Sequence, residues 1–316
     1  MGSNGTTTPS LPDTSHLDGV NYLFGHPIAH SLSPLLHQTV YDNLGLKRSQ
    51  IPLDSTDIPH FLSLTKDPKF FGASVTMPHK VAIIPHLDEI MQEGKDIGAC
   101  NTIFLKQDQN GTRHLVGTNT DCFGVRDAFL QNLPAGKDKD LYRGHPGLVI
   151  GGGGACRSAV YALQKWLGCN PIYIVNRDIS EVTAVLTDCK KAGFGDSLLH
   201  VQTGAQASLL AAPGAIVACI PNFPPKTPEE IEARKVIEVF LRKEEKGAIL
   251  EMCYHPTPWT EIAEISKKEG WQVILGTEAM IYQGLEQDRH WTGKGLEELP
   301  SKEVHAAIAQ ALAARH

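Results

Sequence analysis

The sequence lacks three features that define large classes of proteins. It has no excess of positive charge, because 29 lysine and arginine residues stand against 35 aspartate and glutamate residues, for a net charge of −6. It has no run of about 18 apolar residues, the length that a membrane-spanning helix needs. Its first residues lack the charged and then apolar order of a secretory signal peptide. We therefore expect no nucleic-acid partner and no membrane association, and we expect a small-molecule ligand.

Cysteine is present, but its pattern predicts no cross-link. The seven cysteines are an odd number and none stand at C-x-x-C spacing, so the sequence indicates neither a disulfide framework nor a structural zinc site. The histidines near the N-terminus have no cysteine or carboxylate spacing that would make them metal ligands, and we expect loop or cap roles for them. These patterns predict a cytoplasmic protein without a metal site.

Length and patterning predict an α/β protein with two domains. The chain has 316 residues, of which 41% are hydrophobic, enough for roughly two domains of ordinary size. Residues 19–120 alternate short apolar runs with helical patterns, and the polar segment 134–146 separates them from a second series. That series has continuous apolar runs at 147–150, 172–175, 215–220 and 247–252. Such runs, alternating with helical patterns, are typical of a parallel sheet covered on both faces.

The segment 148–158 predicts a nucleotide site, because an apolar strand ends in four glycines and a helix follows at once. Glycines allow a sharp turn and a close approach to a pyrophosphate, and the first N–H groups of the helix point at the anion. About twenty residues later a second strand ends where a dinucleotide fold tests the adenosine ribose. A tight turn without a ligand is the alternative. The residues that we expect at the cofactor are Gly151, Gly153, Gly154, Ala155, Asn176, Arg177 and Asp178.

Two neighbouring side chains give opposite signals about the cofactor. Arg177 would pair with a 2′-phosphate or stack on adenine, whereas Asp178 would accept a hydrogen bond from a 2′-hydroxyl and repel a phosphate. We expect NAD rather than NADP. A solvated loop is the alternative for both side chains.

Polar side chains also gather where the strands of the first half end. Most have a local explanation as helix caps or turn residues. Lys80 is the exception, because the dipole and free N–H groups at the start of its predicted helix, 78–87, disfavour a cation. A carboxylate such as Asp121 would raise its proton affinity while the dipole lowers it, which suits general acid–base catalysis. The segments concerned are 31–34, 75–80, 98–102 and 117–121.

Taken in order, these motifs resemble the shikimate and quinate dehydrogenase family. The match begins with Gly-His-Pro-Ile-Ala-His-Ser-Leu-Ser-Pro at 25–34, includes the segments above, and continues to Tyr-His-Pro-Thr-Pro-Trp-Thr at 254–260 and to the region 276–293. The resemblance implies an α/β substrate-binding domain and a Rossmann-type dinucleotide domain with a cleft between them. It assigns residues 1–17 to a flexible tail, 18–124 plus 280–316 to the substrate domain, and 125–279 to the dinucleotide domain.

The resemblance also implies the reaction, a reversible NAD(P)-linked oxidation of shikimate or quinate to the 3-dehydro ketone. Lys80 and Asp121 would be the acid–base pair, no metal is needed, and Gly276 would lie at the cofactor. Hydroxyl and amide side chains suit a ring acid with several hydroxyl groups, because unpaired polar groups penalise poorer analogues. The implied substrate contacts are Ser31, Ser33, Thr76, Asn101, Tyr254 and Gln283.

Departures from the family pattern leave the substrate open. Residues 218–222 replace a common Asn-Ala-Thr-Pro sequence near the nicotinamide, and Gln38 and Glu251 replace a usual Asn and Asp. The serines at 31 and 33 resemble the shikimate-specific pattern, whereas the NAD-type features favour quinate or both acids. The alternatives are a non-catalytic metabolite sensor and a dehydrogenase of another hydroxylated ring acid. A folate-type dehydrogenase would explain the glycine turn alone, and the oligomeric state is left open.

Overall fold

The computed structural model describes residues 12–255 and 257–314, so most of the predicted tail lies outside the described residues. The part of that tail which is described contacts the first sheet. The carbonyl oxygens of Thr14 and Ser15 each accept a hydrogen bond from Lys69 Nζ at 3.0 Å. Leu17 packs against the hydrophobic core of that sheet. The fold therefore includes residues before position 18.

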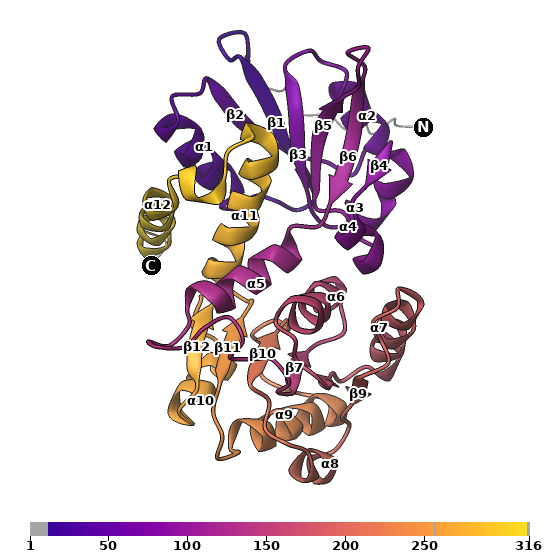
Figure 1. The fold of residues 1–316 in the computed structure, drawn as a ribbon, viewed down its shortest axis with the longest axis vertical. Coiled ribbons are helices and arrows are strands. Elements are labelled where there is room, and N and C mark those ends of the chain that lie inside the picture. The colour runs from indigo at the N-terminus through magenta and orange to yellow at the C-terminus, as the bar shows by residue number, and fades with distance from the viewer. Residues whose placement is uncertain (1–11, 256, 315–316) are drawn as a thin grey trace, which may run out of the picture.

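The N-terminal part of the chain builds a mixed sheet of six strands in the order β2-β1-β3-β5-β6-β4 (Figure 1). Strand β1 pairs in parallel with β2 and β3, while β5 is antiparallel to both of its neighbours. The elements are β1 (Gly19–Gly25), α1 (Ser33–Asn43), β2 (Arg48–Asp54), α2 (Ile58–Leu64), β3 (Phe70–Val75), α3 (His79–Ala82), η1 (Ile84–His86), β4 (Glu89–Ile90), α4 (Gln92–Ile97), β5 (Thr102–Gln107), β6 (Arg113–Thr118) and α5 (Asp121–Gln131).

The second sheet is parallel throughout, with strand order β12-β11-β10-β7-β8-β9. This is the doubly wound order of a dinucleotide-binding Rossmann fold, which confirms the predicted fold class. The elements are β7 (Gly147–Ile150), α6 (Gly154–Tyr161), η2 (Ala162–Trp166), β8 (Ile172–Val175), α7 (Ile179–Lys191), β9 (Leu198–His200), α8 (Gly204–Leu209), β10 (Ala215–Ala218), α9 (Pro228–Leu241), β11 (Ala248–Glu251), α10 (Glu261–Lys268) and β12 (Gln272–Leu275).

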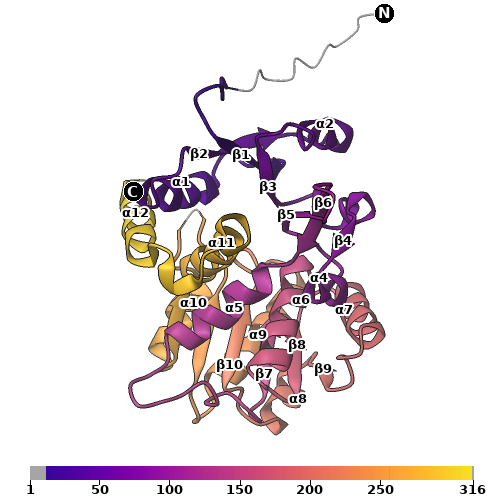
Figure 2. The same ribbon diagram turned by 45° about the horizontal axis from the view of Figure 1, so that its top comes forward.

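Helices cover both faces of this second sheet (Figure 2). Val149 of β7 packs into one core with α5, α6 and α7, whereas its neighbours Leu148 and Ile150 pack into the other with α8, α9 and α10. Side chains alternate between the faces of a strand, so a strand buried on both faces needs apolar residues at every position. This is why the runs 147–150 and 172–175 are continuously apolar.

The C-terminal helices return to the first sheet. Strand β12 leads directly into α11 (Gly276–Thr292), which is followed by η3 (Leu296–Glu298) and α12 (Ser301–Ala313). Leu36 and Val40 of α1 share one core with residues of α11 and α12, including Ile281 and Ile308. Figure 1 shows the indigo helix α1 beside the yellow helices α11 and α12. Val304 and Ile308, on one face of α12, are therefore buried against the N-terminal half.

Helices α5 and α11 cross between the two sheets at close range (Figure 1). A Cβ atom at Gly124 of α5 would lie 2.3 Å from the carbonyl oxygen of Ala279 in α11 and 2.9 Å from Cβ of Gln283. Only glycine permits this approach. The crossing brings the first turn of α5, which carries Asp121, against the segment of α11 that carries Gln283.

The prediction of one helix over residues 78–87 is wrong. Helix α3 is a single turn, and a 3-10 turn containing Pro85 follows it, because proline supplies no N–H to continue an α-helix. A four-residue turn has only a small dipole, so the dipole argument for Lys80 loses its basis.

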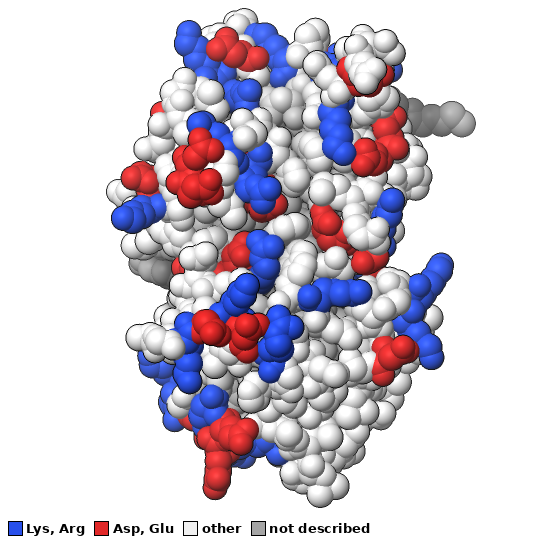
Figure 3. Space-filling model, in the orientation of Figure 1, with Lys and Arg blue, Asp and Glu red and all other residues white. Residues whose placement is uncertain are grey.

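Surface charge and helix hydropathy were the basis for expecting no nucleic-acid or membrane partner. Basic and acidic side chains are interspersed over the face in Figure 3. None of the helices in the described part of the chain has both the length and the hydropathy that crossing a bilayer requires.

We expect Gly124→Ala to destabilise the protein by about 2 kcal/mol, because the added methyl group would force α5 away from a backbone carbonyl of α11. Urea unfolding measures the free energy. Gly204→Ala is the matched control, since a Cβ there would meet only Val239 Cγ2 at 3.6 Å. An unchanged free energy in Gly124→Ala would contradict the close crossing.

Candidate active site

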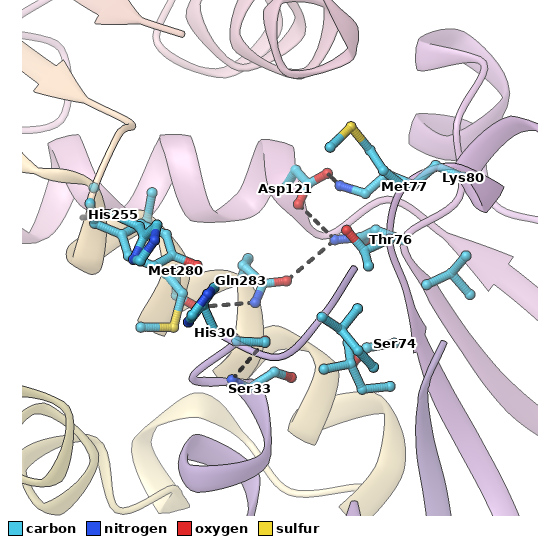
Figure 4. Close-up of a pocket in the computed structure, with 18 of the residues that line it drawn as sticks. His30, Ser33, Ser74, Thr76, Met77, Lys80, Asp121, His255, Met280 and Gln283 are labelled. Carbon is cyan, nitrogen blue, oxygen red and sulfur yellow. Dashed lines mark hydrogen bonds and ion pairs between the residues drawn. The ribbon is translucent and has the colours of Figure 1, made fainter. Parts of the chain in front are cut away.

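A cavity of about 540 Å³ opens beyond the carboxyl ends of strands β1, β3 and β11, and the first turns of α5 and α11 help to line it. This is where open α/β sheets bind ligands. Figure 4 shows its side chains, which come from segments far apart in the sequence. Every residue predicted for substrate or acid–base roles lines it, namely Ser31, Ser33, Thr76, Lys80, Asn101, Asp121, Tyr254 and Gln283.

Lys80 and Asp121 form an ion pair on the wall of this cavity. The Nζ–Oδ2 distance is 2.6 Å, and the side chains are 30% and 22% exposed. The other carboxylate oxygen of Asp121 accepts a hydrogen bond from Asn101 Nδ2 at 2.9 Å. Asp121 begins helix α5, where free N–H groups and the helix dipole stabilise a carboxylate. Both partners therefore hold fixed positions while remaining accessible from the cavity.

Asn101 is oriented from both ends of its amide. Its Oδ1 accepts hydrogen bonds from the backbone N–H of Thr120 at 2.7 Å and from the hydroxyl of Thr102 at 2.8 Å. Its Nδ2 also lies 3.3 Å from Oε1 of Gln283, which belongs to α11. The amide thus ties β5, α5 and α11 together beside the ion pair.

The local explanations for three of these polar residues do not match the structure. Ser33 is the first residue of α1 rather than its cap, and no side chain caps that helix. Thr76 does not cap α3, and Asp121 is the first residue of α5 rather than its cap. Ser31 lies in the loop after β1, where its Oγ accepts a hydrogen bond from Ser33 N at 3.2 Å.

Further buried polar residues, two in the cavity wall and others behind it, were missed from the sequence. Gln50 on β2, Ser74 on β3 and Gln287 on α11 are hydrogen-bonded to one another or to residues of the cavity. His37 and Asp288 extend the cluster through a bond of 2.9 Å between Nδ1 and Oδ2. The amide of Gln50, within strand β2, was the one available signal.

A second cavity, of about 340 Å³, lies beside the glycine turn. Gly151 has φ of +127°, a conformation that other residues rarely adopt. A Cβ atom on Gly153 or Gly154 would meet no heavy atom within 4 Å, so the backbone faces open space at the start of α6. This cradle fits a pyrophosphate. Of the predicted cofactor residues, Gly153, Asn176 and Arg177 line this cavity and Gly276 lines the larger one.

The side chains of this second cavity pair with one another. Arg177 Nη1 forms an ion pair with Glu230 Oε1, and Glu230 completes the capping box that Thr227 begins at the start of α9. Asn176 Nδ2 donates to Glu181 Oε2 at 2.7 Å. Glu181 and Glu230 were both missed as site residues.

Asp178 has a local role in the structure. It caps helix α7, with its carboxylate accepting hydrogen bonds from Ser180 and Glu181. Hydrogen bonds from Ser180 hold the pKa of Asp178 below its ordinary value, the bond from its hydroxyl contributing more than the bond from its N–H.

Glu251 ties the segment after β11 to the second sheet. Its Oε2 accepts a hydrogen bond from Thr260 Oγ1 at 2.7 Å and its Oε1 accepts one from Cys253 N at 3.1 Å. Burial raises the pKa of this carboxyl group to about 7. The tether holds Met252 and Tyr254, which line the larger cavity. The other substitution noted from the sequence, Gln38, donates to Asp42 Oδ1 at 2.8 Å outside the cavity.

The fold and the two cavities define a class of protein, a two-sheet α/β protein with a Rossmann-type dinucleotide site. The described residues contain no group of three or more His, Cys, Asp or Glu side chains placed to hold a metal ion.

Comparison with known proteins narrows this class to a family. The family model of the shikimate dehydrogenase substrate binding domain matches residues 23–103. The chain is 50% identical to the quinate dehydrogenase of Emericella nidulans, over 94% of this chain and 95% of the relative. The chain therefore belongs to the shikimate and quinate dehydrogenase family.

Solved structures of this family have the same fold. The dehydroquinate dehydratase and shikimate dehydrogenase from S. pombe AroM is 30% identical with a TM-score of 0.77, over 92% of this chain and 53% of that one. The shikimate 5-dehydrogenase of Thermus thermophilus in complex with NADP(H) and shikimate is 28% identical with a TM-score of 0.72, over 93% and 99%.

We expect Glu251→Gln to gain stability over the wild type as the pH rises. The pKa of Glu251 is about 7 in the folded protein, against an ordinary value of 4.5, so the folded state retains the proton longer. Below about pH 4.5 burial of the neutral acid carries no ionisation cost, and above about pH 7 the full cost of about 3 kcal/mol applies.

Urea unfolding of both proteins at pH 5, 6.5 and 8 measures this difference. Groups that titrate alike in the two proteins cancel in the comparison. A difference in unfolding free energy that stays constant between pH 5 and 8 would show that Glu251 does not retain its proton on burial.

Proposed function

We propose that the protein catalyses the reversible NAD-linked oxidation of quinate, and also of shikimate, to the 3-dehydro ketone. The observation that carries the proposal is the Lys80–Asp121 pair on the wall of a cavity lined by hydroxyl and amide side chains. The chain's 50% identity to a quinate dehydrogenase supports quinate as a substrate. Members of this family are NAD(P)-dependent dehydrogenases. The acid–base pair and the glycine turn for the dinucleotide are both present in this chain.

The acid–base step uses the ion pair. A secondary alcohol that becomes a ketone loses a hydride from carbon and a proton from oxygen. The bound dinucleotide supplies the hydride acceptor at its nicotinamide ring. The substrate hydroxyl then needs a nearby group that accepts its proton. Lys80 Nζ and Asp121 Oδ2, which lie 2.6 Å apart, act together as this proton acceptor. Asn101 keeps Asp121 turned toward Lys80 through its second carboxylate oxygen.

The remaining residues orient the ring. Ser31, Ser33, Thr76, Tyr254 and Gln283 come from five elements or loops around the cavity, so they contact different edges of a six-membered ring. A ring acid with several hydroxyl groups offers donors and acceptors to match. An analogue that lacks one hydroxyl leaves a protein group unpaired and is penalised.

The charges at the second cavity favour NAD over NADP. Arg177 is paired with Glu230, and Arg234 is paired with Glu261 at 2.9 Å, so neither cation is free to receive a phosphate. Glu181 adds a further carboxylate beside Gly152. A 2′-phosphate would meet like charges here, whereas a ribose hydroxyl would find acceptors.

The experiment that tests the function is a steady-state matrix on the purified protein, with quinate and shikimate each assayed with NAD and with NADP. We expect turnover of quinate with NAD, and kcat/KM at least about tenfold lower with NADP, because bringing a phosphate near carboxylates costs more than about 1.4 kcal/mol. Formation of the reduced nicotinamide is followed by absorbance.

The cofactor argument has its own control. Glu181→Gln removes one carboxylate and should lower the ratio of kcat/KM with NAD to kcat/KM with NADP. A protein that prefers NADP would contradict the charge argument. If neither acid turned over with either cofactor but both raised the melting temperature, the metabolite-sensor alternative would be favoured.

Lys80→Ala should lower kcat by about 10² to 10⁴, because general acid–base groups contribute factors of this size, and Asp121→Asn should do the same. Quinate should still raise the melting temperature of both variants. Lys106→Ala is the matched control, since Lys106 pairs with Glu89 at 3.1 Å on the outer surface of the same sheet. Unchanged turnover in Lys80→Ala would remove the pair from the mechanism.

A further inference from the structure

Met77 differs from the other methionines of the described residues in its exposure to solvent. Its side chain belongs to a residue that is 71% exposed. Met91, Met252 and Met280 are partly buried, and each packs against a hydrophobic core. A dissolved oxidant reacts with the thioethers that it can reach. Met77 is therefore the methionine of this part of the chain that such an oxidant meets first.

The backbone places Met77 on the wall of the larger cavity, close to the acid–base pair. Its carbonyl oxygen accepts a hydrogen bond from the N–H of His26 at 2.9 Å, which ties the segment after β3 to the end of β1. Met77 precedes Lys80 by three residues, and both line the cavity. Figure 4 shows the thioether of Met77 beside the Lys80–Asp121 pair.

The thiols of the chain offer less to the same oxidant. Five of the seven cysteines are buried, and Cys219 and Cys253 are partly exposed. A hydrogen bond with the Cys156 thiol holds the pKa of the Cys219 thiol well above its ordinary value, and a thiol reacts as its thiolate. The thiol of Cys253 donates its proton to the carbonyl oxygen of His255, with an Sγ–O distance of 3.4 Å.

We propose that Met77 is an oxidation site at which hydrogen peroxide lowers the activity of this protein. In this step a lone pair of the thioether sulfur attacks one peroxide oxygen and the O–O bond breaks. The other oxygen takes up the proton of the transferred hydroxyl group and leaves as water, so a sulfoxide remains. Sulfur loses two electrons and the peroxide gains two, and no further reactant is needed. The loss of activity rests on the proposed function, whereas the oxidation itself does not.

The new oxygen changes what surrounds the acid–base pair. A thioether sulfur is a weak hydrogen-bond acceptor, whereas oxidation makes this apolar side chain polar. Lys80 Nζ donates a hydrogen bond to Asp121 at 2.6 Å, and a sulfoxide oxygen beside it is a second acceptor for its protons. A hydrogen bond from Lys80 to the sulfoxide competes with Asp121 and with the substrate hydroxyl, so the pair accepts the substrate proton less well.

Peptide mass mapping after treatment with hydrogen peroxide tests the site. We expect the first added oxygen atom on the peptide that carries Met77, before the peptides that carry the three partly buried methionines. Dithiothreitol is added after the peroxide, because it reverses sulfenic acids and disulfides formed at Cys219 or Cys253 and leaves a sulfoxide in place.

Activity is measured on the same samples as kcat/KM for quinate with NAD, and each protein is compared with itself before treatment. We expect the wild type to lose about tenfold, the size of one hydrogen bond, and methionine sulfoxide reductase to restore the activity. Met77→Leu should retain its activity, because leucine has no sulfur to oxidise. Met280→Leu is the matched control and should lose activity as the wild type does.

A second variant imitates the oxidised side chain without peroxide. Met77→Gln places a polar amide beside Lys80 and should lower kcat/KM by a similar factor in the untreated protein. Equal losses of activity in the wild type and in Met77→Leu would overturn the proposal, and so would a first oxygen atom on another methionine.

A binding measurement separates this proposal from the proposed function. Absence of turnover in the untreated protein would count against the proposed function alone. The calorimetric dissociation constant of quinate, measured before and after peroxide, then tests Met77, and we expect it to rise about tenfold in the wild type and to stay the same in Met77→Leu. A constant that peroxide leaves unchanged in the wild type would count against the role of Met77.

Discussion

The close crossing of helices α5 and α11 is the constraint on which the site depends. Helix α5 carries Asp121 at its start and leads from the first sheet to the second, while α11 carries Gln283 and Gln287 and leads back. Gly124 lets the two backbones approach to a distance that no larger residue allows. The two helices therefore hold one wall of the cavity in fixed relation to strands of both sheets.

Asn101 connects the two ends of the cavity. Its side chain holds Asp121 toward Lys80 at the reacting end, and its backbone carbonyl sets the orientation of Gln287 at the other. Buried polar groups must each find a partner, so one fixed acceptor determines the direction of every hydrogen bond that follows. The hydrogen bonds of Asn101 thus hold polar side chains of the cavity wall in fixed orientations.

At the second cavity, beside the glycine turn, one side chain contributes both to helix stability and to the charge that a cofactor meets. Glu230 is the N3 residue of the capping box that Thr227 begins at helix α9, and the same carboxylate pairs with Arg177 at the second cavity. Asp178, expected to bind the ribose, caps α7. The acidic character of this corner therefore comes from Glu181 and Glu230, whose place beside Arg177 depends on how α7 and α9 pack.

The sequence by itself determined the fold class, the parallel second sheet, the glycine turn and the residues predicted for substrate and acid–base roles, all of which line the larger cavity. These depend on patterns between chain neighbours and on motifs whose order resembles a known family. Only the tertiary structure decided that Lys80 stands on a single turn, that Glu230 reaches Arg177, and that Ser33 donates a hydrogen bond to Gln50. Such contacts join residues far apart in the chain, as far as the 251 positions between His37 and Asp288. A buried amide carries no sign in the sequence of the partner it will meet, because packing alone selects that partner.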